Sequence, residues 1–147
     1  MDSLLFKRPC ILIQDLQRSL TLYEDILGFK LTYQSLAGQD SYLYKLFQLP
    51  TQATINFASL DSPNQARALA LTEVKNIDAS FFQPQARVAM VTQVDSVKQV
   101  VEQVQKLELP VLPANHFETE SQLQFTEQGI QDFDGNLLVL YSCDRPE

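Results

Sequence analysis

Apolar and polar residues in the first half of the chain follow two periods, which predict strands and one amphipathic helix. The run RPCILI, residues 8–13, is short, apolar and β-branched, and it predicts a strand. Asp15 can cap a helix start, and apolar residues then recur at helical spacing over residues 16–27, up to a stop at Gly28. Three further segments read as strands, at residues 29–35, 53–60 and 67–74.

The second half of the chain repeats this order of elements. Residues 87–92 predict a strand, and the apolar stripe over residues 97–107 predicts a helix that ends before Pro110. Three more strand-like segments follow, at residues 109–113, 122–130 and 136–142. The repeat therefore predicts two βαβββ modules of an α+β fold with mixed sheets.

The numbering offset between the two copies changes along the chain. Arg8 and Arg87 differ by an offset of 79 (87 minus 8), whereas Leu16 and Val97 differ by an offset of 81 (97 minus 16). We therefore predict that Arg87 corresponds to Arg8, and that the second copy has two extra residues between its strand and its helix.

We expect one domain over residues 1–147, with the first module at about 5–75 and the second at about 84–143. Residues 40–50 interrupt the first module and predict a short helix. The surrounding segment, residues 37–52, is an insertion rich in aromatic side chains, and it is our candidate for a lid.

Composition narrows the class of protein. The 147 residues are 45% hydrophobic, which is enough for a core, and the net charge of −7 argues against binding to nucleic acid or to an anionic membrane. Cys10 and Cys143 lack the spacing of a zinc site, and no apolar run approaches the roughly 20 residues of a membrane span. We expect a soluble, cytoplasmic protein with reduced thiols.

Two motifs carry a resemblance to a known family. The segments DLQRSLTLYEDILGFKL and DFDGNLLVLYS, in this order within two βαβββ modules, resemble the vicinal oxygen chelate superfamily. This group contains glyoxalase I, bleomycin-resistance proteins and extradiol dioxygenases, and the resemblance covers almost the whole chain. It implies sheets curled into a cup, often a dimer, and in many of its enzymes a divalent metal ion in the cup.

The resemblance also implies where metal ligands would lie. Carried onto this sequence, the four positions fall on Arg8, Ala70, Arg87 and Val139. None of these side chains offers a lone pair to a divalent ion, so we predict no metal and no cofactor. The only histidine, His116, is predicted to lie in a surface loop. Metal-dependent glyoxalase I and dioxygenase chemistry are therefore not expected, and no catalytic residue is assigned.

Strand alternation predicts which side chains face the cup. Our hypothesis is a metal-independent small-molecule-binding protein, whose ligand is an anion such as a carboxylate or phosphate ester held by Arg8 and Arg87. The alternative is that these arginines pair with local carboxylates or point to solvent. Seven residues form the predicted ligand-binding set: Arg8, Cys10, Ala70, Thr72, Arg87, Val139 and Tyr141.

Three other functions stay open at this point. An antibiotic-sequestering resistance protein is one, because the acidic charge would attract a cationic drug. A lyase-like or isomerase-like enzyme is another, with Tyr141 or Cys10 supplying acid or base chemistry. The third is a structural or interaction module. On resemblance we also expect a homodimer, in which each site draws one module from each subunit.

Overall fold

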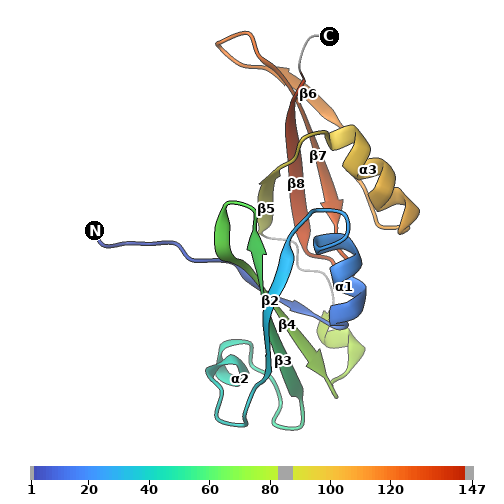
Figure 1. The fold of residues 1–147 in the computed structure, drawn as a ribbon. Helices are drawn as coiled ribbons and strands as arrows, with labels where there is room; N and C mark the ends of the chain where they lie inside the picture. Colours follow the sequence, from blue (N-terminus) through green and yellow to red (C-terminus); the bar gives the residue numbers. More distant parts are fainter. Residues whose placement is uncertain (1, 83–87, 145–147) are drawn as a thin grey trace. The chain divides into compact units, whose positions relative to one another are not determined.

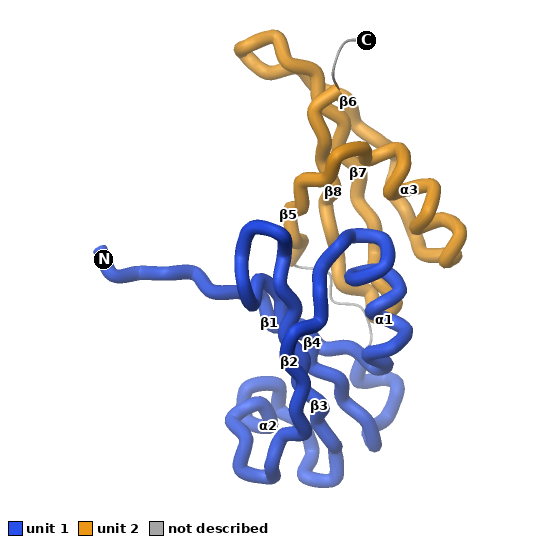
Figure 2. Tube along the Cα trace, viewed as in Figure 1, with its two compact units in different colours: residues 1–82 blue, residues 83–147 orange. Residues whose placement is uncertain are grey.

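A computed structural model describes residues 2–82 and 88–144 of the chain (Figure 1). The chain divides into two compact units, unit 1 with residues 1–82 and unit 2 with residues 83–147 (Figure 2). The units are described separately below. Arg87 lies outside the described residues, and the single-domain organisation stays a prediction.

Unit 1 forms one four-stranded sheet in the order β1-β4-β3-β2. Strand β1 runs parallel to β4, and the other neighbouring strands are antiparallel. The elements along the chain are β1 Cys10–Ile13, α1 Leu16–Tyr23, β2 Lys30–Leu36, α2 Tyr42–Leu46, β3 Thr54–Ser62, β4 Gln65–Lys75 and the 3₁₀ helix η1 Ala79–Phe82.

Unit 2 forms a second four-stranded sheet in the equivalent order, β5-β8-β7-β6. Here β5 runs parallel to β8, and the other pairs are antiparallel. Its elements are β5 Ala89–Gln93, α3 Val97–Lys106, β6 Asn115–Glu118, β7 Gln124–Gln131 and β8 Leu137–Asp144. The two units therefore confirm the predicted repeat of βαβββ modules and the α+β class with mixed sheets.

Helix α1 begins where the sequence predicts and ends earlier than predicted. The Asp15 carboxylate accepts a hydrogen bond of 3.1 Å from the Arg18 backbone N–H, which caps the helix start. After Tyr23 the backbone hydrogen bonds no longer follow the α-helical pattern, because the Asp25 N–H donates to the Leu20 carbonyl, five residues earlier. The regular helix stops there, and the chain leaves through Gly28 at φ +90°, a conformation that glycine adopts without strain.

The two helices are anchored to their sheets by equivalent bonds. The Leu16 N–H at the start of α1 donates to the Glu73 carboxylate on β4, at 2.6 Å. The Val97 N–H at the start of α3 donates to the Ser142 hydroxyl on β8, at 3.1 Å. Each helix thus covers one face of its own sheet. Glu73 and Ser142 occupy equivalent positions, at an offset of 69 (142 minus 73).

Strand register corrects the predicted offset between the copies. Cys10 pairs with Ala70, and Val91 pairs with Val139, which is the equivalent of Ala70 at the same offset of 69 (139 minus 70). Cys10 and Val91 differ by an offset of 81 (91 minus 10), which equals the offset between the helix starts. The predicted two-residue insertion is therefore wrong.

This constant offset also changes which residue corresponds to Arg8. Adding 81 to 8 gives Ala89, the first residue of β5, and not Arg87. The predicted equivalence of the two arginines is wrong, because it aligned two identical residues that are two positions out of register.

One strand prediction in unit 2 is also wrong. In residues 109–113, Val111 makes only an isolated bridge to Ile130, and the strand β6 follows at Asn115–Glu118. Pro110 and Pro113 lack the N–H groups that a ladder needs, so the strand forms after them. His116 accordingly lies on β6, where it pairs with Thr126 of β7, and not in a loop.

The aromatic insertion of unit 1 belongs to a small core. Tyr44 and Phe47 pack against a cluster formed by Leu49, Ala53, Ile55 and Val74. The Tyr44 hydroxyl donates to the Ala53 carbonyl at 2.7 Å. The predicted helix before Pro50 is confirmed as α2, and its role as a lid stays a prediction. No helix among the described residues is long and apolar enough to cross a membrane.

Candidate functional site

The sheet face of unit 1 opposite α1 carries several of the predicted site residues. Cross-strand partners share a face, and register aligns Cys10, Ala70, Ser59 and Tyr33 in one row across the four strands. Thr72 lies on the same face, because its hydroxyl is 3.3 Å from the Cys10 thiol. Ala70 and Thr72 are almost fully buried, so they form the floor rather than polar contacts for a ligand.

A pocket of about 270 Å³ opens on this face. We call it the arginine pocket, and five residues line it: Arg8, Tyr33, Phe57, Ser59 and Arg67. Tyr33 and Phe57 meet edge to face, with ring centroids 6.3 Å apart. Ser59 is 2% exposed, and its hydroxyl has no hydrogen-bond partner among the described residues. A buried hydroxyl of this kind normally has a partner, so Ser59 is an unsatisfied polar group in the pocket wall.

Arg67 enters the pocket because of a bulge in the β3–β4 hairpin. Leu60 pairs with Leu69 and Ser62 pairs with Gln65, so extra residues lie on the β4 side between these pairs. Arg67 is in this bulge at φ +52°, a left-handed conformation that is strained for a side chain with Cβ. Bulges commonly re-aim side chains at functional sites.

The bulge is held by a carboxylate. The Arg67 backbone N–H donates to Asp61 at 2.8 Å, and the Thr32 hydroxyl donates to the same oxygen at 3.0 Å. These two bonds, the backbone bond first, lower the pKa of the Asp61 carboxyl from its ordinary value. The carboxylate therefore stays ionised and fixes the backbone that presents Arg67.

The same backbone also fixes Arg8. The Arg8 Nε donates to the Arg67 carbonyl at 2.8 Å. Among the described residues, neither the terminal nitrogens of Arg8 nor the guanidinium of Arg67 has a hydrogen-bond or ion-pair partner. Two cationic groups with open donors therefore line one small pocket, in a chain whose net charge is −7. Asp61 offsets part of the Arg67 charge, and a bound anion would offset the charge that remains on the two guanidinium groups.

The remaining predicted residues lie in unit 2 or outside the described part. Val139 and Tyr141 share one face of β8, where Tyr141 donates to the Gln93 side chain at 3.3 Å. Neither this bond nor the Cys10–Thr72 contact gives Tyr141 or Cys10 a basic partner. The predicted set as a whole stays a prediction, and sequence reasoning missed Arg67, Ser59, Tyr33 and Phe57.

Comparison with known proteins identifies the family. The sequence model of the Glyoxalase/Bleomycin resistance protein/Dioxygenase superfamily matches residues 6–140. The chain belongs to this superfamily. A search of curated proteins finds no match.

Several solved structures resemble the chain over nearly its whole length. A glyoxalase family protein from Bacillus cereus has a TM-score of 0.67 at 12% identity, covering 97% of this chain and 98% of its own. A fosfomycin resistance protein from Listeria monocytogenes, complexed with Mn(II) and sulfate, has 0.62 at 16%, covering 97% and 93%. An antibiotic-binding protein from a Streptomyces species has 0.60 at 13%, covering 98% and 99%. At these identities the likeness shows the fold alone.

The metal positions of the superfamily do not fit a metal ion in this member. Carried over by resemblance and with the corrected register, they would fall on Arg8, Ala70, Ala89 and Val139. A guanidinium has no lone pair, and the alanine and valine side chains have no donor atoms. Among the described residues, no group of three or more His, Cys, Asp or Glu side chains could hold a metal. The arginine pocket thus offers hydrogen-bond donors, and not metal ligands, to a bound molecule.

Proposed function

We propose that this superfamily member binds a small organic anion in the arginine pocket and uses no metal ion to do so. The observation that carries the proposal is the pair of guanidinium groups, Arg8 and Arg67, with open donors beside the unpartnered Ser59 hydroxyl. Arg67 takes the role that the sequence prediction gave to Arg87. Arg87 stays a candidate contributor from the second module.

The pocket chemistry favours a carboxylate or a phosphate ester. Both groups accept bidentate hydrogen bonds from a guanidinium, and a third acceptor lone pair would satisfy Ser59. The rings of Tyr33 and Phe57 would contact an apolar part of the ligand. A mutant of the Listeria fosfomycin resistance protein, which shares the fold, is complexed with Mn(II) and a dihydroxypropylphosphonic acid. That small phosphonate supports the class of ligand, although its protein holds a metal.

Calorimetric titration with a matched set of probes tests the proposal. Benzoate and phenyl phosphate should bind, whereas benzylamine should not bind in the arginine pocket. Each of Arg8→Gln and Arg67→Gln should weaken binding about 10- to 100-fold, because a charge-assisted bond contributes about 1.5–3 kcal/mol. Arg87→Gln tests the second module in the same way.

The matched control is Lys75→Gln, which removes an exposed cation at the end of β4 outside the pocket. It should leave anion binding unchanged. If Lys75→Gln and Arg67→Gln weakened anion binding equally, binding would depend only on the overall charge of the protein, and the arginine pocket would be rejected as the site. Zinc, nickel or manganese bound at one equivalent in the purified protein would reject metal independence.

Antibiotic sequestration is the second candidate, favoured by the shared fold with the antibiotic-binding Streptomyces protein. The two pocket arginines point to an anionic drug rather than the cationic one considered from net charge. Fosfomycin in the same titration, together with growth under drug with and without the gene, separates this role from general anion binding. An unaltered growth rate in both arms would reject it.

The assembly and location also remain proposals. We propose a homodimer on the strength of superfamily membership alone, and a cytoplasmic location because Cys10 and Cys143 are free cysteines. Light scattering after gel filtration measures the assembly, and a mass of one chain of 16.7 kDa would reject the dimer.

A further inference from the structure

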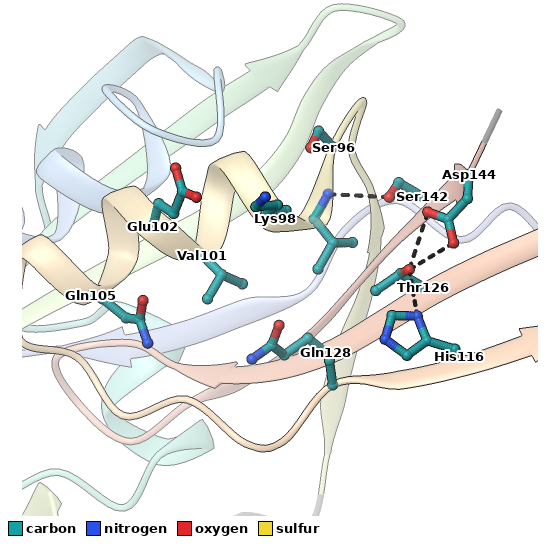
Figure 3. Close-up of a pocket in the computed structure, with 12 residues that line it drawn as sticks. Ser96, Lys98, Val101, Glu102, Gln105, His116, Thr126, Gln128, Ser142 and Asp144 are labelled. Carbon is teal, nitrogen blue, oxygen red and sulfur yellow. Dashed lines mark hydrogen bonds between the residues drawn. The ribbon is translucent and has the colours of Figure 1, made fainter. Parts of the chain in front are cut away.

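Unit 2 has a second pocket, of about 500 Å³, which the proposed function does not use. It lies between α3 and the strands β6 to β8 (Figure 3). Ser142, whose hydroxyl binds the start of α3, lines it, so the pocket is on the sheet face that carries the helix. This face is opposite to the one that bears the arginine pocket in the equivalent sheet of unit 1. We call it the histidine pocket, after His116.

A hydrogen-bond chain crosses one wall of the histidine pocket (Figure 3). The Thr126 hydroxyl donates to Asp144 at 2.8 and 3.1 Å, and it lies 3.0 Å from the His116 Nδ1. An ionised carboxylate only accepts, so the single hydroxyl proton of Thr126 is committed to Asp144. The His116 Nδ1 must then carry the proton that it donates to Thr126. In neutral His116 the other nitrogen, Nε2, therefore keeps its lone pair.

That lone pair faces the pocket. Figure 3 shows the second ring nitrogen of His116 turned toward the side where Gln128 and Val101 lie. Asp144 has further lone pairs, because Thr126 occupies only part of its acceptor capacity. An imidazole acceptor from β6 and a carboxylate from β8 thus line the same pocket.

The rest of the lining sets the class of ligand. Val97 and Val101 form an apolar floor and are 1% and 7% exposed. Glu102 and Lys98 line the helix side and offset one another in charge, which leaves the charge of Asp144 uncompensated in the lining. An apolar floor next to acceptors and one net negative charge suits a small amine with an apolar body.

We infer that the histidine pocket is a second binding site, in which the ammonium group of a small apolar amine donates to His116 Nε2 and is attracted by the charge of Asp144. The Asp144–Thr126–His116 chain positions the imidazole by fixing its tautomer. This site is independent of the arginine pocket, since the two pockets lie in different units and recognise opposite charges.

The tautomer can be read directly, because His116 is the only histidine in the chain. Long-range ¹H–¹⁵N spectra at about pH 8, above the usual imidazole pKa of about 6.5, should show a protonated Nδ1 and an unprotonated Nε2. Thr126→Val should shift the ring toward the Nε2–H tautomer that free imidazole prefers. A wild-type ring already in the Nε2–H form would overturn the inference.

Titration with benzylamine, benzyl alcohol and benzoate tests the ligand class. Benzylamine should move the His116 ring signals with the tightest binding, and benzoate should leave them in place while acting on unit 1. Asp144→Asn and Thr126→Val should each weaken benzylamine binding about tenfold, because the first removes the attracting charge and the second lets Nε2 take the proton and lose its lone pair. Glu118→Gln, on the same strand as His116 but outside the pocket, should change nothing.

The outcomes separate this inference from the proposed function. Loss of benzoate binding with benzylamine binding intact would reject only the arginine pocket. Benzylamine that leaves the His116 signals unmoved, or that binds Asp144→Asn as well as wild type, would reject only the histidine pocket. Backbone amide spectra of each variant establish that it is folded.

Discussion

The two units have the same sheet topology, but their pockets lie on opposite faces of the equivalent sheets. Both have the same strand order, the same parallel pair and the same helix anchor. In unit 1 the described pocket is on the face opposite α1, and in unit 2 it is on the face that carries α3. A duplicated sheet therefore provides two surfaces per copy, and each unit has its described pocket on a different one.

Equivalent positions on the two helix faces carry side chains of different length. Gly129 pairs with Val139 as Ser59 pairs with Ala70, so β7 follows β3 at an offset of 70 (129 minus 59). The equivalent of Gln128 is then Ala58, which is fully buried. Unit 1 therefore has a small apolar side chain at this position of its helix face. Unit 2 has the longer, polar Gln128 there, which lines the histidine pocket.

The helix anchors give the largest expected difference between the units. Leu16 N–H binds the charged Glu73, whereas Val97 N–H binds the neutral Ser142. Glu73→Ala should lower the free energy of unfolding by about 2–3 kcal/mol, and Ser142→Ala by about 1 kcal/mol, because bonds to charged acceptors are stronger. Urea unfolding followed by circular dichroism at neutral pH measures both. Glu73→Gln, which keeps an acceptor, is the control and should lose less than Glu73→Ala.

Equal losses in Glu73→Ala and Ser142→Ala would contradict this comparison. They would mean that the anchor contributes through position alone, and that the charge on Glu73 adds nothing at the start of α1. The helix macrodipole argues against this, since an anion at a helix N-terminus is stabilising.

Two buried serines of unit 1 should have similar, smaller effects on stability, and only one of them should affect binding. Ser19 and Ser59 are both nearly inaccessible, and neither hydroxyl has a partner among the described residues. Ser19→Ala and Ser59→Ala should each raise the free energy of unfolding by about 1 kcal/mol, because an unsatisfied buried hydroxyl is costly. Only Ser59→Ala should weaken benzoate binding, since Ser19 lies in α1 and Ser59 lines the pocket.

Thermal unfolding and calorimetry on the two variants give both readings. If Ser59→Ala binds benzoate like the wild type, its hydroxyl has no part in recognition. If Ser59→Ala loses stability instead, the hydroxyl is satisfied within the folded protein, and the match with Ser19 fails.

The elements predicted correctly from the sequence are those in which the local residue pattern matches the contacts that the residues make in the fold. The helix at Val97 has a stripe of valines facing the sheet, and the turn at Asp132 has the residues that bond its backbone. Residues 109–113 misled because their apolar character outweighed the two prolines that prevent pairing. Strand β6 was missed because it is a polar, exposed edge strand with little apolar alternation.

The candidate sites were harder to predict for a physical reason. Alternation places Arg67 on the face opposite Ala68, and the bulge at that point changes the side-chain direction. The turn composition before Arg67 indicated a hairpin, but no sequence pattern showed that this hairpin contains a bulge. His116, Thr126 and Asp144 lie far apart along the chain, and only the register of three strands brings them together.

The smallest expected effect concerns the hairpin that holds Arg67. Asp61 accepts from the Arg67 backbone and from Thr32, and these bonds place its carboxyl pKa below the ordinary value of 3.8. A depressed folded-state pKa means that the carboxylate stabilises the fold fully above pH 3.8 and less as the pH falls through the folded pKa. Carboxyl ¹³C titration should show this low pKa in the wild type.

A variant and a second carboxylate sharpen this test of the hairpin. Asp61→Asn should loosen the bulge, seen as faster amide exchange at Arg67, while unit 2 keeps its exchange rates. Asp78, whose pKa Ser80 also lowers, is the control outside the pocket, and its protonation should not disturb Arg67. An Asp61 pKa at or above 3.8 would show that the hairpin does not depend on this charge, and that the bulge is held by its strand pairing alone.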